Sequence, residues 1–323
     1  MMEYFIGVDG GGTKTAYLLC DEEGRVRAQR SAIGSSYRQH GFETVFHNLG
    51  ENVKALFAEA GADERALCGI ALGLPLYGEQ AESDRRLREG VASLFAGAGT
   101  LVVNDVDVGY MGSLAGKPGI NIVAGTGSIA FGRDEGHNTA RSGGWWEFFG
   151  DEGSCYWLGR MTMGLFAKEA DGRAPRAALY RLVREEFGLG SDFEFVDIIE
   201  RDYAPYREKV ASLQVILEKA AKEGDPGAVA LYREAAHELA LAVRGVRDQF
   251  CFGNEFAVSY SGGLFKAGEL VLAPFRQEVG EMGGRLCTPL LSPVMGAALL
   301  AFEQFAPERF DAAVRALLEQ EGK

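Results

Sequence analysis

The stretch FIGVDGGGTKT, residues 5–15, places three consecutive glycines between an apolar run and a Thr-Lys-Thr sequence, with Asp9 directly before the first glycine. Glycine adds no packing surface and loses more conformational entropy on folding than any other residue. A glycine triplet at the end of a strand therefore indicates that something approaches the backbone closely. Phosphate, bound by successive backbone N–H groups, is the ligand that we expect there.

This stretch differs from a Walker A motif, because the spacing fails and the next residues favour a second strand over a helix. We therefore expect a hairpin whose glycine amides and threonine hydroxyls face phosphate oxygens, while a neighbouring carboxylate holds Mg²⁺ through water. A tight turn without a ligand is the alternative. The candidate nucleotide-binding residues of the hairpin, the first of which is also the candidate Mg²⁺ ligand, are Asp9, Gly10, Gly11, Gly12, Thr13, Lys14 and Thr15.

The composition indicates a globular protein of two domains, since 323 residues exceed the usual size of one domain and 47% of them are hydrophobic. The formal charge of −13 disfavours nucleic acid and anionic membrane surfaces as partners. The five cysteines are scattered without a Cys-x-x-Cys pair, which favours reduced thiols in or near the core. Neither a membrane-spanning apolar run nor a leader pattern is present, so we expect a cytoplasmic protein.

The first third of the chain alternates strand and helix patterns in the order βββαβαβ. The expected strands are residues 3–9, 14–21, 25–32, 68–74 and 100–105, and the expected helices are about 42–60 and 81–95. A second succession of strand, glycine turn and strand begins at Gly119, in GINIVAGTGSIAFGR. This echo indicates an α/β protein with two related halves that face each other across a cleft.

The second half of the chain sets the expected domain limits. From Asp151 to about residue 250 the pattern is helical, and strand patterns return at 255–265 before a helix that begins near Pro293. We expect an N-terminal domain at 1–118 and a C-terminal domain at 119–306, with a helical insertion at about 151–250. A final helix at about 307–323 can pack back on the first domain.

An aspartate ends the apolar strand TLVVND, where a carboxylate would lie at the mouth of a cleft. Asp105 is therefore the candidate base for a substrate hydroxyl, and Asp107 is its rival. If a helix begins at Val106, Asp105 is instead its N-cap. Such a carboxylate suits phosphoryl transfer, in which positioning the nucleophile and neutralising charge matter more than covalent chemistry.

Further glycine-rich segments extend the candidate site. The turn in AGTGS supplies Gly125, Thr126, Gly127 and Ser128, and SYSGGLF supplies Gly262 and Gly263 after a strand. In RSGGWWEFFGDEGSCYWLG, glycines and acids precede a helix, where the carboxylates either receive sugar hydroxyls or complement the helix dipole. The aromatic residues of this segment either form a sugar-stacking wall or, as is commoner, belong to the core; they are Trp145, Trp146, Phe148 and Phe149.

In this order the motifs resemble those of the BadF/BadG/BcrA/BcrD ATPase family, and more closely its N-acetylglucosamine kinase-like branch, within the superfamily of sugar kinases, actin and heat-shock ATPases. The matching motifs are DGGGT at 9–13, ND at 104–105, GTGS at 125–128, and the GGW, GDEGS and YW sequences within 143–157. The resemblance covers residues 1 to about 300. It implies two ribonuclease-H-like domains of the actin-like ATPase type, hinged around a cleft that holds magnesium and ATP.

The resemblance also implies an activity, the transfer of the γ-phosphate of ATP to a hydroxyl of an N-acetylhexosamine or amino sugar. By matching position, Asp105 is the base of this reaction. The implied phosphate contacts are Gly10, Gly11, Gly12, Thr13, Thr126 and Gly127, the implied adenosine contacts are Gly262 and Gly263, and the implied sugar contacts are Ser36, Gly143, Gly144 and Asp151.

Three departures from the family pattern leave the sugar and its hydroxyl open. Ser36 stands where Asn is usual, Trp146-Glu147 where Gly-His is usual, and GLPLYGE at 73–79 where a Ser-Gly-rich segment is usual. Homodimer formation also stays open.

Two alternatives belong to other functional classes. An ATPase that activates a partner redox enzyme needs cysteines gathered around a shared iron–sulfur cluster, and the scattered cysteines disfavour it. The acidic chain, without a Cys-rich zinc motif, disfavours a DNA-binding regulator.

Overall fold

The computed structural model describes residues 2–250, 252 and 255–321, which form two compact units. Unit 1 comprises Met1–Lys117 and Thr288–Lys323, and unit 2 comprises Pro118–Cys287. The expected end of the second domain at residue 306 differs from this division, because residues 288–306 belong to unit 1. The reason is that α12 (Pro293–Phe305) packs against β1 (Tyr4–Gly10) and α4 (Asp105–Leu114).

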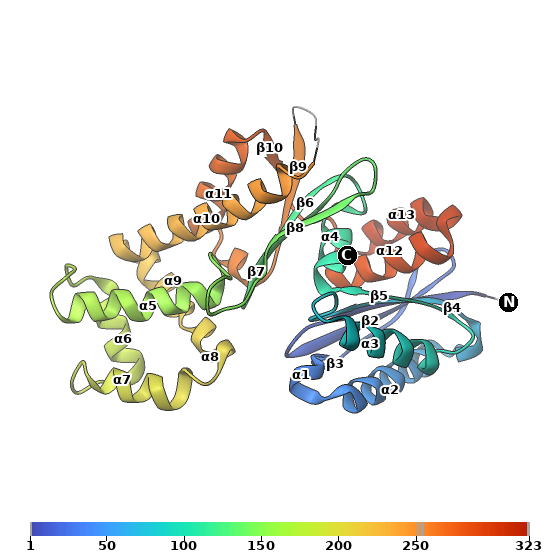
Figure 1. Ribbon diagram of the computed structural model, residues 1–323, viewed down its shortest axis with the longest axis horizontal. Helices are drawn as coiled ribbons and strands as arrows, with labels where there is room; N and C mark the ends of the chain where they lie inside the picture. The colour runs from blue at the N-terminus through green and yellow to red at the C-terminus, as the bar shows by residue number, and fades with distance from the viewer. Residues whose placement is uncertain (1, 251, 253–254, 322–323) are drawn as a thin grey trace. The chain divides into compact units, whose positions relative to one another are not determined.

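Unit 1 is built on a five-stranded sheet with the strand order β3-β2-β1-β4-β5 (Figure 1). Its other strands are β2 (Lys14–Asp21), β3 (Val26–Ile33), β4 (Leu67–Leu74) and β5 (Gly99–Asn104). Its other helices are α1 (Tyr37–His40), α2 (Phe42–Ala60), α3 (Ala81–Leu94) and α13 (Phe310–Glu321). Strand β1 pairs antiparallel with β2 and parallel with β4, so it lies at the centre of the sheet.

Both faces of β1 are buried, because successive side chains of a strand point to opposite layers. Ile6 belongs to the apolar layer formed with α2 and α3, whereas the Phe5 ring lies 4.2 Å from the Phe302 ring of α12 in the other layer. Figure 1 shows the two helical layers on opposite sides of this sheet. Gly7 permits the close approach of α12, since a Cβ there would lie 2.5 Å from the Val294 carbonyl oxygen.

Unit 2 repeats the same topology, with the strand order β10-β9-β6-β7-β8. Its strands are β6 (Gly119–Ala124), β7 (Ser128–Arg133), β8 (Thr139–Gly143), β9 (Phe256–Ser261) and β10 (Gly284–Leu286). As in unit 1, three strands form an antiparallel meander and two more extend the sheet in parallel. The predicted α/β fold with two ribonuclease-H-like, actin-like ATPase domains is therefore confirmed.

The helices of unit 2 between β8 and β9 form the helical insertion that the sequence predicts. They are α5 (Cys155–Ala170), α6 (Ala178–Phe187), α7 (Glu194–Ile198), a π-helix (Ile199–Tyr203), α8 (Arg207–Ser212), α9 (Gln214–Lys222) and α10 (Pro226–Arg247). Helix α10 packs along β6, β7 and β8, and α11 (Glu269–Glu281) packs beside α10 and β10.

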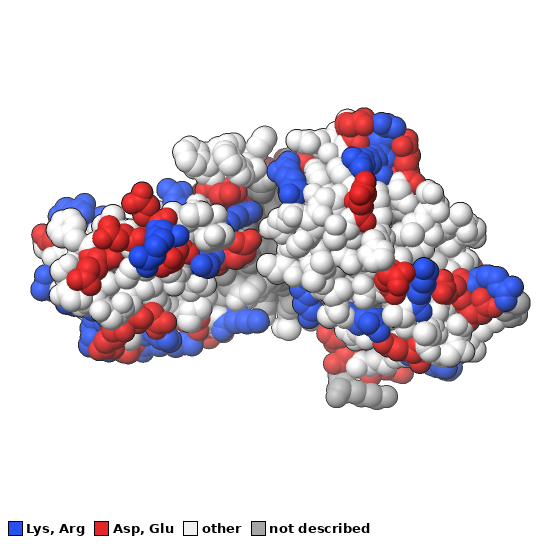
Figure 2. Space-filling model, turned by 90° about the horizontal axis from the view of Figure 1, so that it is seen from below, with Lys and Arg blue, Asp and Glu red and all other residues white. Residues whose placement is uncertain are grey.

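The surface carries charges of both signs. On the face drawn in Figure 2, acidic and basic side chains are interspersed without an extended basic area. Such a face differs from the basic stripe by which proteins bind a nucleic-acid backbone. Within the described ranges, no helix is both long enough and apolar enough to cross a membrane.

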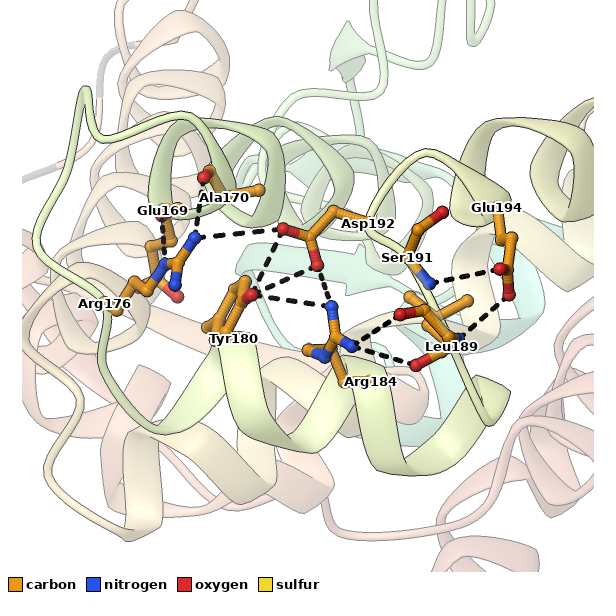
Figure 3. A network of polar contacts seen from close by, with 10 residues as sticks. Glu169, Ala170, Arg176, Tyr180, Arg184, Leu189, Ser191, Asp192 and Glu194 are labelled. Atoms are coloured by element: carbon orange, nitrogen blue, oxygen red, sulfur yellow. Dashed lines mark hydrogen bonds and ion pairs between the residues drawn. The ribbon is translucent and has the colours of Figure 1, made fainter.

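A polar network fixes the connection between α6 and α7 in the insertion (Figure 3). The Tyr180 hydroxyl donates to Asp192, with 3.1 Å to each carboxylate oxygen, and Arg184 pairs with the same carboxylate. A second nitrogen of Arg184 donates to the Leu189 carbonyl at 3.0 Å. Arg176 lies over the Tyr180 ring at 4.3 Å and donates to carbonyls near the end of α5. Arg176 also lies 3.9 Å from the Asp192 carboxylate, so this carboxylate joins three side chains that hold α5, α6 and the following turn.

We expect Asp192→Ala to lower the free energy of unfolding of unit 2 by about 1 kcal/mol, because the hydroxyl and both guanidinium groups lose a partly exposed acceptor. Urea denaturation followed by tryptophan fluorescence measures this change, since all three tryptophans lie in unit 2. Asp202→Ala, which removes an exposed pair with Arg201, is the matched control and is expected to change little. Equal losses in both variants would show that the network adds nothing beyond a surface ion pair.

Candidate active site

The glycine stretch near the start of the chain forms the predicted hairpin. Strand β1 ends at Gly10 and β2 begins at Lys14, and the Gly11 amide donates to the Lys14 carbonyl at 2.9 Å. The Ser35 amide donates to the Gly11 carbonyl at 3.0 Å, which fixes the turn against the segment after β3. The turn is therefore held by backbone hydrogen bonds that need no ligand.

The glycines of this hairpin serve different purposes. A Cβ on Gly10 would overlap the Ser35 hydroxyl and lie 2.8 Å from the Gly73 carbonyl oxygen, so this glycine is required by packing. A Cβ on Gly12 would meet nothing closer than the Gln39 side chain at 3.7 Å. Gly12 therefore has free space on the side where a Cβ would point, whereas packing within the fold explains Gly10.

The polar side chains of the hairpin also divide into two groups. Thr13 and Lys14 are exposed at the turn. Thr15 is fully buried, and its hydroxyl has no hydrogen-bond partner among the described residues. Ser36, predicted as a sugar contact, is buried at the start of α1, where its carbonyl accepts from the Gln39 amide at 3.1 Å. Thr13 and Lys14 are thus the hairpin side chains that a ligand can reach from solvent.

Asp105 is the first residue of α4, and its expected alternative role as N-cap is wrong. Asn104 is the cap: its side-chain oxygen accepts from the Val106 amide at 3.2 Å. The Asp107 carboxylate accepts from the Asn104 amide, also at 3.2 Å, which completes a capping box. The cap therefore occupies Asn104 and Asp107 and leaves the Asp105 carboxylate outside it.

Burial and charge raise the pKa of the carboxyl groups at this sheet edge. Burial first, and then the carboxylates of Asp9 and Asp107, raise the pKa of Asp105 to about 7, against opposing hydrogen bonds from backbone amides at the start of α4. Burial raises the pKa of Asp9 to about 6, although Lys14 opposes the shift, and burial raises the pKa of Asp107 to about 6. Asp105 can therefore take up and release a proton near neutral pH.

In unit 2 the predicted second glycine turn joins β6 to β7. The Gly125 amide donates to the Gly127 carbonyl at 2.9 Å, and the Cys155 amide at the start of α5 donates to the Gly125 carbonyl at 2.9 Å. The Ser128 hydroxyl donates to the Glu152 carbonyl at 2.7 Å. Within the described part of the chain, the amides of Thr126 and Gly127 have no hydrogen-bond partner. These two N–H groups are suited to an anionic ligand.

Asp151 supports this turn rather than standing open in a pocket. It is 4% exposed and adopts a left-handed backbone conformation with φ of +57°. One carboxylate oxygen accepts from the Ser128 amide at 3.1 Å, and the other pairs with Arg207 of α8. A Cβ on Gly127 would lie 2.7 Å from the Arg207 guanidinium and 2.8 Å from the Asp151 carboxylate, so the glycine makes room for this ion pair.

The sequence analysis did not identify Arg207. It lies 56 positions after Asp151, in a helix of the insertion, and no local motif marks it. The signal that could have found it is physical: a carboxylate that must be buried beside a glycine turn requires a cationic or hydrogen-bonding partner.

The remaining predicted residues of unit 2 lie around the same turn. Gly143 ends β8 and Gly144 follows it, with φ of +79° and +66°, and the Gly144 amide donates to the Ser128 carbonyl at 2.9 Å. Gly262 follows β9, the parallel neighbour of β6, and a Cβ there would overlap the Ala124 carbonyl. A Cβ on Gly263 would meet nothing within 4 Å. The structure thus gathers these glycines around the turn, and Gly263 is the open one of the second pair.

The aromatic segment after Gly144 is exposed, so the commoner assignment of these residues to the core is wrong. The exposed fractions are 74% for Trp145, 53% for Trp146, 77% for Phe148 and 65% for Phe149. The rings of Phe148 and Phe149 lie 5.8 and 6.1 Å from the Trp146 ring. The rings of Trp146, Phe148 and Phe149 therefore form a small exposed cluster.

Several known proteins are similar to this chain over most of its length. The chain is 29% identical over 262 residues to an N-acetylmuramic acid/N-acetylglucosamine kinase of Clostridium acetobutylicum, covering 81% of this chain and 85% of that protein. It is 26% identical over 314 residues to an N-acetyl-D-glucosamine kinase of Dictyostelium discoideum, covering 93% and 98%. The solved structure of a putative N-acetylglucosamine kinase from Chromobacterium violaceum matches with a TM-score of 0.76 and 28% identity, over 93% of this chain and 99% of that one.

The family comparison covers almost the entire chain. The model of the BadF/BadG/BcrA/BcrD ATPase family matches residues 6–301. This range contains both glycine turns, Asp105 and the segment with Asp151. The chain therefore belongs to the BadF/BadG/BcrA/BcrD ATPase family.

Proposed function

We propose that the chain is an ATP-dependent kinase that transfers the γ-phosphate to a hydroxyl of an N-acetylhexosamine or amino sugar, with Asp105 as the base. The observation that carries this proposal is the position of Asp105: outside the capping box, beside Asp9, with burial raising its pKa to about 7. A base with a pKa near the working pH combines a useful fraction of the ionised form with enough basicity to accept a proton. Kinase names among the relatives at 26–29% identity support the same reaction.

Both glycine turns are proposed to contact the phosphates of ATP. In unit 1, the open backbone at Gly12 and the exposed Thr13 and Lys14 supply N–H, hydroxyl and ammonium donors. In unit 2, the amides of Thr126 and Gly127 supply two further donors. Charge on the transferring phosphoryl group is spread over its oxygens, so fixed donors of this kind lower the barrier without covalent chemistry.

The other predicted contacts are proposed from the match of their positions to the family motifs. The open backbone at Gly263, beside Gly262, is proposed for the adenosine. Gly143, Gly144 and Asp151 are proposed for the sugar, together with Ser36 of unit 1. For Asp151 this contact would come in addition to its bonds to Ser128 and Arg207.

Asp9 is the residue proposed to hold Mg²⁺, through water. Its partly buried carboxylate has a pKa raised to about 6 and lies near the Asp105 carboxylate, so a cation would relieve the cost of ionising both groups. The described residues contain no group of three or more His, Cys, Asp and Glu side chains that could hold a metal ion. Bound there, Mg²⁺ would neutralise phosphate charge.

The alternative function, activation of a redox partner, is not favoured by the cysteines. Cys20 and Cys155 are buried, and burial raises the pKa of the Cys155 thiol to about 11. Cys68 and Cys287 are partly exposed and belong to different units. Cys251 lies outside the described residues. Ligands of an iron–sulfur cluster must be thiolates gathered at one place.

We expect Asp105→Asn to lower kcat by at least about 100-fold, because the amide cannot accept the proton of the sugar hydroxyl. ATP affinity, measured by titration calorimetry, is expected to stay within about twofold to threefold. Asp107→Asn is the matched control: its amide oxygen still accepts from the Asn104 amide, and we expect near-normal turnover. Normal turnover in Asp105→Asn with loss in Asp107→Asn would move the base role to Asp107.

The raised pKa of Asp105 also predicts a pH dependence. The base must be ionised, so kcat is expected to rise about tenfold per pH unit below 7 and to level off above it. The same shift destabilises the fold as pH rises through 7, because the folded state holds the proton more tightly than the unfolded state. Asp105→Asn is therefore expected to melt at a higher temperature than wild type at pH 8 but not at pH 4. A flat profile for kcat between pH 5.5 and 8 would contradict the assignment.

An acceptor screen tests the substrate class. We expect sugar-dependent ADP release with N-acetylglucosamine, N-acetylmannosamine, N-acetylmuramic acid or glucosamine, and weaker release with glucose. The discrimination rests on polar groups that a sugar lacking the amino substituent leaves unpaired. ADP release that no sugar accelerates would contradict the kinase assignment.

A further inference from the structure

The left-handed conformation of Asp151 requires support from its surroundings. A φ of +57° is uncommon for a residue with a Cβ and persists where neighbouring contacts hold it. Both oxygens of the buried Asp151 carboxylate are engaged, one by the Ser128 amide at 3.1 Å and the other by Arg207. Arg207 is the only cationic partner that the described residues offer to this carboxylate.

The ion pair lies directly against the glycine turn. A Cβ on Gly127 would come within 2.7 Å of the guanidinium and 2.8 Å of the carboxylate, so the pair and the turn cannot be rearranged independently. A Glu147 carboxylate oxygen lies 3.7 Å from the Arg207 Nε, which adds a longer ion pair to the guanidinium. The Tyr156 ring lies 5.9 Å from the guanidinium carbon, which adds a weaker contact from α5.

Loss of the guanidinium would leave a buried carboxylate without its counter-charge. Burial raises the pKa of Asp151 and Arg207 opposes that rise, so the carboxyl group would more readily take up a proton without Arg207. A neutral carboxyl group accepts the Ser128 hydrogen bond less strongly and no longer favours the strained backbone. The first consequence would be loosening of the turn at residues 125–128.

We propose that Arg207, from helix α8 of the insertion, is a positioning residue that holds Asp151 and, through it, sets the shape of the glycine turn Gly125–Ser128. The inference rests on the proposed function for its kinetic part, in which this turn contacts the transferring phosphate. Its structural part stands without that function. It assigns the helical insertion a task in the reaction, since α8 supplies the group that fixes the turn.

The test compares Arg207→Met, Arg207→Lys and Arg201→Met. Methionine keeps most of the apolar stem and removes the charge, whereas lysine keeps the charge without the planar geometry. Arg201 pairs with exposed Asp202 in the same insertion, which makes Arg201→Met the matched control. Hydrogen exchange of peptides that cover residues 124–131 is expected to be at least tenfold faster in Arg207→Met, partly restored in Arg207→Lys and unchanged in Arg201→Met.

Measurements of kcat and KM distinguish a positioning role of Arg207 from a contribution to general stability. Misplacement of the turn is expected to lower kcat on the order of tenfold to a hundredfold in Arg207→Met, with a smaller change in KM for the sugar and partial recovery in Arg207→Lys. When Asp151→Asn is already present, adding Arg207→Met is expected to lower kcat only slightly further, because the two residues act as one unit. Unchanged exchange at 124–131, an equal increase along the entire chain, or additive effects in the double variant would overturn the proposal.

The exchange measurement needs no turnover. If no sugar is phosphorylated by the wild-type protein but exchange at 124–131 responds as expected, the proposed function fails while the positioning role stands. If turnover is normal in wild type and in Arg207→Met alike, the positioning role fails while the proposed function stands.

Discussion

The site of unit 1 depends on two carboxyl groups, those of Asp9 and Asp105, which lie close together and are partly buried. Strand β1 runs parallel to β4, and β4 runs parallel to β5, so the carboxyl ends of β1 and β5 lie at one edge of the sheet. Asp9 is the residue before the last of β1, and Asp105 directly follows β5. Burial raises the pKa of Asp9 to about 6, and burial together with the charges of Asp9 and Asp107 raises the pKa of Asp105 to about 7. The pairing of β1, β4 and β5 thus places Asp9 close enough to influence the basicity of the proposed base.

The same edge is kept rigid by backbone packing. Gly7 allows α12 to lie against β1, and Gly73 faces Val108 of α4, where a Cβ would lie 2.7 Å from the valine methyl groups. The capping box of Asn104 and Asp107 fixes the first turn of α4, and the Asn104 side chain also donates to the Tyr77 carbonyl at 2.6 Å. Asp105 therefore stands on a helix start whose own requirements its neighbours already satisfy. This arrangement leaves its carboxylate available for chemistry.

The elements that the sequence predicted well are those with a local signal. The hairpin around the glycine triplet, the helix at 42–60 and the helix that begins at Pro293 follow from hydrophobic periodicity and turn residues, and the structure places them at those positions. The doubled strand, turn and strand pattern predicted the repeated topology. Local patterns also favoured Asp105 over its rival, although the assignment of the cap to Asn104 required the hydrogen bonds.

What the sequence could not provide depends on contacts between distant residues. Thr15 pairs with Gly10 across the hairpin, and this register buries its hydroxyl instead of directing it to the turn. The attachment of α12 to unit 1 depends on Gly7, some 290 residues earlier in the chain. Arg207 reaches Asp151 through the packing of α8 against α5. The aromatic cluster after Gly144 differs in another way. Clusters of aromatic residues usually belong to the core, whereas these side chains are exposed.

The two glycine turns have the same place in the same topology, but they are stabilised by different physics. The turn of unit 1 is held by close backbone packing, with Gly34 against Gly12 and the Ser35 amide on the Gly11 carbonyl. The turn of unit 2 is held by an ion pair between the buried Asp151 carboxylate and the partly exposed Arg207 guanidinium, directly beside Gly127. Packing between neutral backbone groups responds little to pH or salt, whereas a carboxylate that needs a guanidinium depends on the charge of both partners. The first turn is therefore a fixed part of its sheet, and the second depends on the helical insertion that supplies its cation.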